Sequence, residues 1–149
     1  MSVPRARAAS WLIGTGLVLI LLQGCGSGAV RDTLLQATVD TEAAVRSGSL
    51  ALRLLDTGAA TRAVTETTFV DMTRQLASAQ TSVLELDLSS AADSGLRDDT
   101  LAAVNAGTAA VLAGRDCVQL DNSCIPAEAA LRRSGDRLAE LKTQLEAGR

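Results

Sequence analysis

The chain has 149 residues, of which 47% are hydrophobic, with 14 Lys and Arg residues against 17 Asp and Glu residues. It contains no His, which excludes Ser-His-Asp and Cys-His catalytic arrangements and His-based metal sites. An acidic chain with one Trp, one Phe and no Tyr lacks the basic surface and the stacking rings that nucleic-acid binding requires. We therefore expect no nucleic-acid partner, and a core built from Leu, Val and Ala.

The first 24 residues have the pattern of a targeting segment. Arg5 and Arg7 supply a positively charged start, and Trp11–Leu22 is a run without charge. This run has the length of the apolar region of a secretory signal peptide, and it is shorter than the roughly 20 residues of a membrane span. The pattern predicts a signal peptide over residues 1–24.

The tetrapeptide Leu22-Gln23-Gly24-Cys25 resembles the lipobox of bacterial lipoproteins, with an apolar residue three before the Cys and a small one directly before it. Gln23 departs from the small residue usual at its position. The resemblance implies that Cys25 carries the lipid, including palmitate, and that the protein is anchored to the extracytoplasmic face of a membrane in the cell envelope. The alternative is an ordinary signal peptide or an uncleaved anchor with an incidental Cys.

The rest of the chain divides into a short linker and one domain. Residues 25–30 are expected to be the lipidated Cys and a flexible tether, because Gly26-Ser27-Gly28 is a Gly/Ser stretch. Residues 31–149 suffice for one hydrophobic core, and their Ala, Leu, Arg, Gln and Glu favour helix over strand. We predict an all-α fold, an antiparallel bundle of about four helices. In composition the domain resembles small Ala- and Arg-rich helical lipoproteins of high-GC bacteria, a likeness that carries no functional residues.

Apolar periodicity predicts the first two helices over residues 31–55 and 60–88. Ser47-Gly48-Ser49 predicts a kink or break in the first, and Asp56-Thr57-Gly58 predicts its end, with Gly58 near the position that favours a left-handed residue. The second helix has a coiled-coil-like repeat and is followed by a polar loop over residues 88–95. The expected buried residues are Leu35, Val39, Ala43, Leu50 and Leu54 in the first helix, and Phe69, Met72, Leu76, Ala79, Val83 and Leu86 in the second.

The third and fourth helices are expected over residues 97–113 and 126–147. Asp98 and Asp99 would lie in the first turn of the third helix and Gly114 would end it, while Pro126 suits the first position of the fourth. Polar residues inside these stripes, Thr108 and Ser134, could mark a small pocket or a partner groove. The expected buried residues are Leu101, Val104, Thr108 and Val111 in the third helix, and Ala127, Leu131, Ser134, Leu138, Leu141 and Leu145 in the fourth.

Cys117 and Cys124 lie in the predicted connection between the third and fourth helices. An exported domain resides in an oxidising compartment, and this spacing allows the two residues to close a loop. We predict a structural disulfide, with free or reactive thiols and a metal-binding pair as alternatives. The redox spacing of two intervening residues is absent.

One motif points to catalysis. Asp56-Thr57-Gly58 resembles the catalytic Asp-Thr-Gly of retropepsin-type aspartic proteases, and Gly114-Arg115-Asp116 is similar to a later stretch of that family. The resemblance implies that Asp56 would share a proton with a second Asp and activate water. However, that fold is nearly all β, whereas residues 60–88 have a helical repeat and contain no Gly.

The sequence therefore favours a non-enzymatic, lipid-anchored protein, an envelope adapter, accessory or structural protein that contacts a partner through a helix face. No cofactor and no metal are expected. The alternatives are a lipoprotein that binds a small ligand and an aspartic-type protease acting through Asp56.

Overall fold

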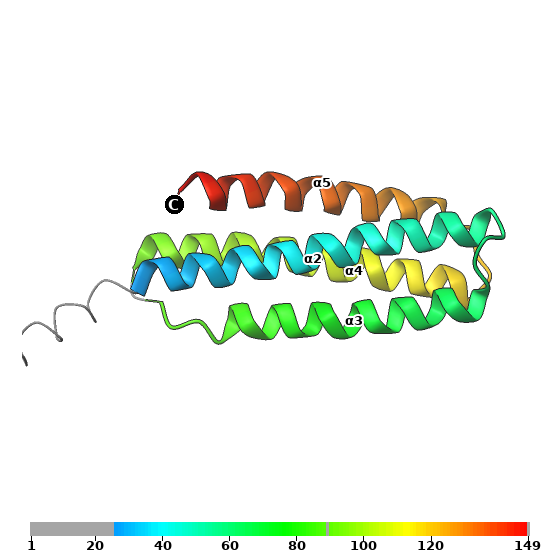
Figure 1. Ribbon diagram of the computed structural model, residues 1–149, viewed down its shortest axis with the longest axis horizontal. Coiled ribbons are helices and arrows are strands. Elements are labelled where there is room, and N and C mark those ends of the chain that lie inside the picture. Colours follow the sequence, from blue (N-terminus) through cyan, green and yellow to red (C-terminus); the bar gives the residue numbers. More distant parts are fainter. Residues whose placement is uncertain (1–25, 89, 149) are drawn as a thin grey trace, which may run out of the picture.

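Four α-helices make up the part of the chain that the computed structural model describes, residues 26–88 and 90–148. They alternate in direction and form an up-down bundle (Figure 1). Strands are absent from these residues, so the predicted all-α class is confirmed. The predicted signal peptide and Cys25 lie outside the described residues. The helices are α2 (Gly26–Asp56), α3 (Arg62–Leu84), α4 (Ala91–Gln119) and α5 (Ile125–Ala147).

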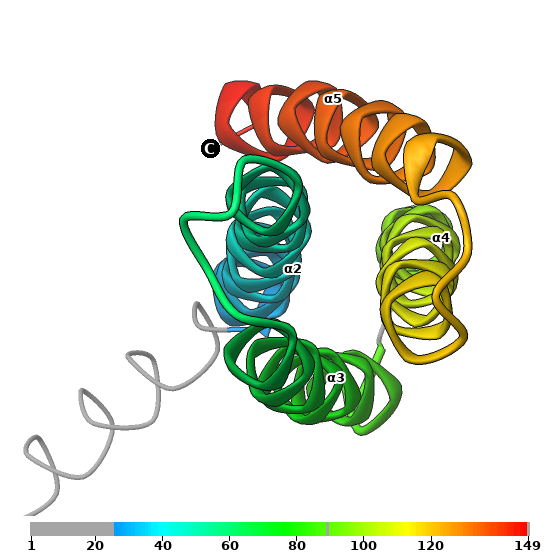
Figure 2. The same cartoon turned by 90° about the vertical axis from the view of Figure 1, so that its right-hand side faces the viewer.

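Viewed from its end, the bundle has α2 opposite α4 and α3 opposite α5 (Figure 2). Each of α2 and α4 lies next to the three other helices, whereas the backbones of α3 and α5 lie farther apart, on the other diagonal. Small residues allow α2 and α4 to approach across the centre. A Cβ atom added at Gly107 of α4 would lie 2.8 Å from Cγ2 of Thr41 in α2, closer than two carbon atoms can pack.

Helices α3 and α5 bury the faces that their periodicity predicts. Phe69, Met72, Leu76, Ala79 and Val83 are buried in α3, while Leu86 lies beyond its end and is half-buried. The helix ends at Leu84 rather than at the predicted residue 88. All six residues predicted for the buried face of the last helix are buried in α5, and Pro126 lies at its start. Most inward positions of these two helices hold hydrophobic residues, with Thr65, Ser134 and Gly135 as the exceptions, so hydrophobicity identifies the face.

The predicted buried face of α2 was wrong. Leu50 and Leu54 are 48% and 39% exposed, Ala43 is exposed, and Leu35 and Val39 are only half-buried. The buried residues of α2 are Val30, Leu34, Ala37, Thr38, Thr41, Ala44, Val45, Gly48, Ala51 and Leu52. Six of these ten are Thr, Gly or Ala, so the inward face is less hydrophobic than the predicted row beside it. Thr38 and Thr41 are tolerated because their hydroxyls donate to the carbonyls of Leu34 and Ala37, at 2.8 and 2.7 Å.

The limits of α2 also differ from the prediction at its start. Residues 26–30 of the stretch expected to be a flexible tether are helical and belong to α2. Val30 is buried, and its burial favours helical structure ahead of the predicted start at residue 31. No break occurs at Gly48, which faces Phe69 and Leu131. The helix ends at Asp56 as expected, and Gly58 has φ +70°.

Helix α4 is longer than predicted at both ends. It begins at Ala91, because the Ser90 hydroxyl accepts a hydrogen bond from the Asp93 amide at 3.0 Å and donates to the Asp93 carboxylate at 2.7 Å. Asp98 and Asp99 are therefore not in its first turn. Gly114 does not end the helix but is buried inside it. Of the predicted face, Val104 and Val111 are buried, whereas Leu101 and Thr108 are half-buried.

Candidate functional sites

Cys117 and Cys124 lie within disulfide-bonding distance, with sulfur atoms 2.16 Å apart and Cα atoms 5.3 Å apart. Cys117 is buried near the end of α4, and Cys124 is the residue directly before α5. The pair therefore joins the end of one helix to the start of the next, in agreement with the predicted pairing.

Arg62, at the start of α3, also contacts the turn between α4 and α5. Its guanidinium donates to the Val118 carbonyl through Nη1 and to the Asp121 carboxylate through Nη2. Asp121 has φ 55°, in the left-handed region, which Asp tolerates better than most residues. The ion pair connects two turns at the end of the bundle farthest from Gly26.

Asp56, the predicted catalytic residue, lies at this same end. It is the exposed last residue of α2 and lines an open groove together with Arg62 and Asp121. The amide and hydroxyl of Thr57 donate to the Arg53 carbonyl, so Asp-Thr-Gly forms a helix stop. Gly114-Arg115-Asp116 lies within α4. Neither segment has the β-structure of the aspartic proteases that it resembles.

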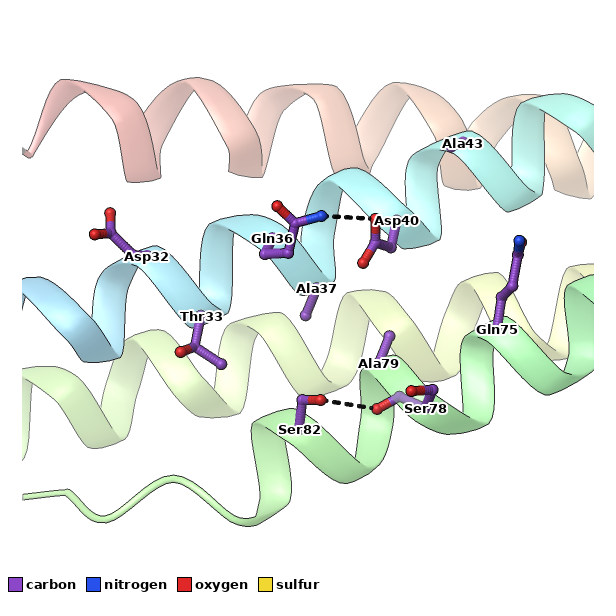
Figure 3. A pocket seen from close by; sticks show the side chains of 10 residues that line it. All are labelled: Asp32, Thr33, Gln36, Ala37, Asp40, Ala43, Gln75, Ser78, Ala79 and Ser82. Atoms are coloured by element: carbon purple, nitrogen blue, oxygen red, sulfur yellow. Dashed lines mark hydrogen bonds between the residues drawn. The ribbon is translucent and has the colours of Figure 1, made fainter.

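A groove between α2 and α3 was not predicted from the sequence (Figure 3). It has a volume of about 590 Å³, and its base contains Ala37 and Ala79. Gln36 donates to the Asp40 carboxylate at 2.8 Å, and Ser82 donates to the Ser78 carbonyl at 3.1 Å. The other lining residues are Asp32, Thr33, Ala43 and Gln75. This groove offers hydrogen-bonding groups and two carboxylates, but no large apolar side chain.

From the sequence, two polar residues, Thr108 and Ser134, could mark a pocket or a groove. Thr108 is half-buried and donates to the Val104 carbonyl at 2.9 Å. Ser134 is 7% exposed, and its hydroxyl has no hydrogen-bond partner among the described residues. Ser134 Oγ lies 3.6 Å from the position of a Cβ at Gly107, so it packs in the close contact between helices rather than in a groove.

Large apolar side chains remain exposed on the bundle surface. Leu50 and Leu54 project from α2, and Val64 projects from the facing part of α3. Together they border a small apolar hollow of about 190 Å³. The remaining exposed large apolar residues of the described chain are Val70, Leu84, Leu120 and Ile125. The sequence periodicity detected Leu50 and Leu54 but assigned them to the core.

Within residues 26–88 and 90–148, no group of three or more Cys, Asp or Glu residues is arranged to hold a metal ion. Over the same ranges, no helix combines the length and hydrophobicity needed to cross a membrane. Comparison with protein-family models, with curated proteins and with solved structures gives no match.

Proposed function

We propose that this chain is a lipid-anchored extracytoplasmic protein of non-enzymatic type, which acts as an envelope adapter, accessory or structural protein. The observation that carries the proposal is the lipobox-like Leu22-Gln23-Gly24-Cys25 after an uncharged run. In the structure, residues 26–30 are part of α2. A lipid on Cys25 would therefore be close in the sequence to a helix of the bundle.

Two further features support this proposal. The disulfide-distance pair Cys117 and Cys124 suits an oxidising, extracytoplasmic compartment. The exposed Leu50, Leu54 and Val64 supply apolar surface of the kind that mediates protein contacts.

Fatty-acid labelling tests the anchor. The full chain is expressed in a bacterial host fed with an alkyne-bearing palmitate analogue, and the label is detected after membrane extraction. We expect labelling of the natural chain, loss of the label in Cys25→Ser, and retention in Cys124→Ser as the matched cysteine control. The lipoprotein proposal is wrong if the natural chain stays unlabelled or if Cys25→Ser keeps the label.

In-cell crosslinking followed by mass spectrometry tests the adapter role. We expect a reproducible protein partner with the natural chain, and loss of that partner with Cys25→Ser. The absence of any crosslinked protein at native expression, with the chain correctly lipidated, would contradict the adapter role and leave the anchor intact.

A second candidate function, binding of a small polar ligand, is favoured by the groove between α2 and α3. Its charged lining groups, Asp32 and Asp40, are both acidic, and opposite charge favours a cationic ligand. Titration of the isotope-labelled protein with putrescine tests this candidate by NMR. We expect saturable shifts of amides in residues 32–43 and 75–82, and shifts absent from or uniform over the whole chain would remove it.

A further inference from the structure

Arginines from two helices line one groove of the bundle. Helices α2 and α5 lie side by side and run in opposite directions (Figures 1 and 2), and the groove between them has a volume of about 480 Å³. Arg46 and Arg53 line it from α2, and Arg132 lines it from α5. Buried Leu131 and Gly135 lie at its base. The volume is within the range of sites that hold small molecules.

Close packing between the two helices sets the order of the arginines along the groove. A Cβ atom added at Gly48 would lie 3.3 Å from Cδ2 of Leu131, so these two residues are level. A Cβ atom added at Gly135 would lie 3.8 Å from Cγ and 4.0 Å from Cζ of Arg46, so the Arg46 side chain lies against the α5 backbone. Because the helices are antiparallel, Arg132 comes between the two arginines of α2 along the groove. A ligand beside Arg132 therefore has an arginine of α2 on each side of it.

Most of the donors in this groove are not satisfied within the molecule. Arg46 uses only Nε, which donates to the Glu42 carboxylate at 2.7 Å. Arg53 and Arg132 form no ion pair with any residue of 26–88 and 90–148. The Ser49 hydroxyl also lines the groove, and within the same ranges it has no hydrogen-bond partner. The groove thus presents guanidinium and hydroxyl donors to a ligand.

The lining of the groove has an excess of positive charge. Its two carboxylates, those of Glu128 and Asp136, each lie four residues from Arg132, a spacing that allows ion pairs on a helix. Neither carboxylate forms an ion pair with any described residue. The charged residues of the groove between α2 and α3 are, by contrast, Asp32 and Asp40. In a chain of net charge −3, three arginines against two carboxylates favour an anionic ligand at this one place.

We propose that the groove between α2 and α5 binds the phosphate group of a small phosphorylated molecule. Arginine suits phosphate because its planar guanidinium donates two parallel hydrogen bonds to two oxygens. A phosphate has several acceptor oxygens, so Arg132 and a neighbouring arginine of α2 bind it together, with Ser49 as a further donor. The rest of the groove accommodates the organic part of the ligand. This site is separate from the acidic groove between α2 and α3, and it does not depend on the lipid anchor.

Ordering of side chains and competition within the groove limit the affinity. Arg53 and Arg132 are exposed, so a ligand must immobilise both side chains. Asp136 lies one turn from Arg132 and competes with the ligand for its guanidinium. We therefore expect binding that weakens as the salt concentration rises. Removal of the competing carboxylate should strengthen it.

Titration of the isotope-labelled full chain in dodecyl maltoside micelles tests the site by NMR. The probes are inorganic phosphate and glycerol 3-phosphate, added at constant pH and at an ionic strength held constant with sodium chloride. We expect saturable shifts of amides in residues 46–53 and 128–136 with both probes. Shifts that are absent, that do not saturate, or that sodium chloride alone reproduces would overturn the proposal.

Three variants test the assignment to these side chains. Arg132→Gln should weaken binding of glycerol 3-phosphate by about threefold to tenfold, since a charge-assisted contact at an exposed site is lost. Arg133→Gln is the matched control, because exposed Arg133 is the next residue of α5 and lines a different groove. It should leave the affinity unchanged. Asp136→Asn should tighten binding, a gain that a misfolded variant would not give. Equal affinities of Arg132→Gln and Arg133→Gln would overturn the proposal.

Nanodiscs distinguish a free phosphorylated molecule from a lipid headgroup. The labelled full chain is placed in phosphatidylcholine nanodiscs with and without phosphatidylglycerol. A headgroup ligand would shift the Gly135 amide when phosphatidylglycerol is present, and Arg132→Gln would abolish this shift while Arg133→Gln would not. A free ligand would leave that amide unchanged by the lipid and shifted by glycerol 3-phosphate. Both results support the phosphate site and name its source, whereas a Gly135 amide that responds to neither would overturn it.

Discussion

The Phe69 ring occupies the space that a side chain at Gly114 would need. A Cβ atom at Gly114 would lie 2.5 Å from Cε1 and 2.6 Å from Cζ of Phe69, and one at Gly48 would lie 3.4 Å from Cε1. Phe69, the one Phe of the chain, is fully buried. The largest core side chain of α3 is thus accommodated by two glycines on the helices beside it, α2 and α4.

Gly114→Ala is expected to destabilise the protein by up to about 2 kcal/mol. Overpacking against a buried ring costs roughly 1–3 kcal/mol, and the better helix propensity of Ala offsets about 1 kcal/mol of this cost. Urea unfolding followed by circular dichroism at 222 nm measures the change. Gly95→Ala is the control in the same helix, because a Cβ there meets nothing within 4 Å. It should stabilise by about 0.5–1 kcal/mol. Equal stability of the two variants would contradict the close contact with Phe69.

The sequence predicted the helices and most of the core where inward residues are mainly hydrophobic, as in α3 and α5. It misplaced the face of α2, because burial there depends on close helix contact at Thr41 and Gly48 rather than on hydrophobicity. Gly114 was interpreted as a helix stop because the sequence does not distinguish a glycine that ends a helix from one that makes room for a side chain on another helix. Here that side chain is the Phe69 ring. The groove between α2 and α3 depends on which sides of the two helices face each other. The apolar periodicity of one helix does not give this information.

Reduction of the Cys117–Cys124 pair should lower the free energy of unfolding by roughly 2–2.5 kcal/mol, the chain-entropy value for a loop of this size. Urea unfolding with and without a phosphine reductant measures the difference for the natural chain. Cys124→Ser should reproduce the loss and should no longer respond to reductant. An unfolding midpoint that is unchanged by reductant would contradict a stabilising disulfide.

Arg62→Gln should loosen the turn between α4 and α5 with only a small effect on global stability. The Arg62 side chain is 46% exposed, so its contacts with Asp121 and the Val118 carbonyl should contribute at most about 1 kcal/mol. Hydrogen exchange of residues 118–124 should become faster. Arg74→Gln breaks an exposed pair with Asp71 within α3 and should leave those residues unchanged. Unaltered exchange in Arg62→Gln would show that the Arg62 contacts do not hold the turn.

Ser134→Ala should stabilise the protein by about 1–2 kcal/mol, although the residue is buried. The Ser134 hydroxyl has no partner among the described residues, and an unsatisfied buried polar group costs about 1–3 kcal/mol. Alanine also favours the helix by several tenths of a kcal/mol. Ser82→Ala is the control for helix propensity, since exposed Ser82 donates to the Ser78 carbonyl. Urea unfolding should therefore show a larger gain for Ser134→Ala than for Ser82→Ala. A loss of stability in Ser134→Ala would instead indicate that this hydroxyl is satisfied in solution, for example by a water bound beside Gly107.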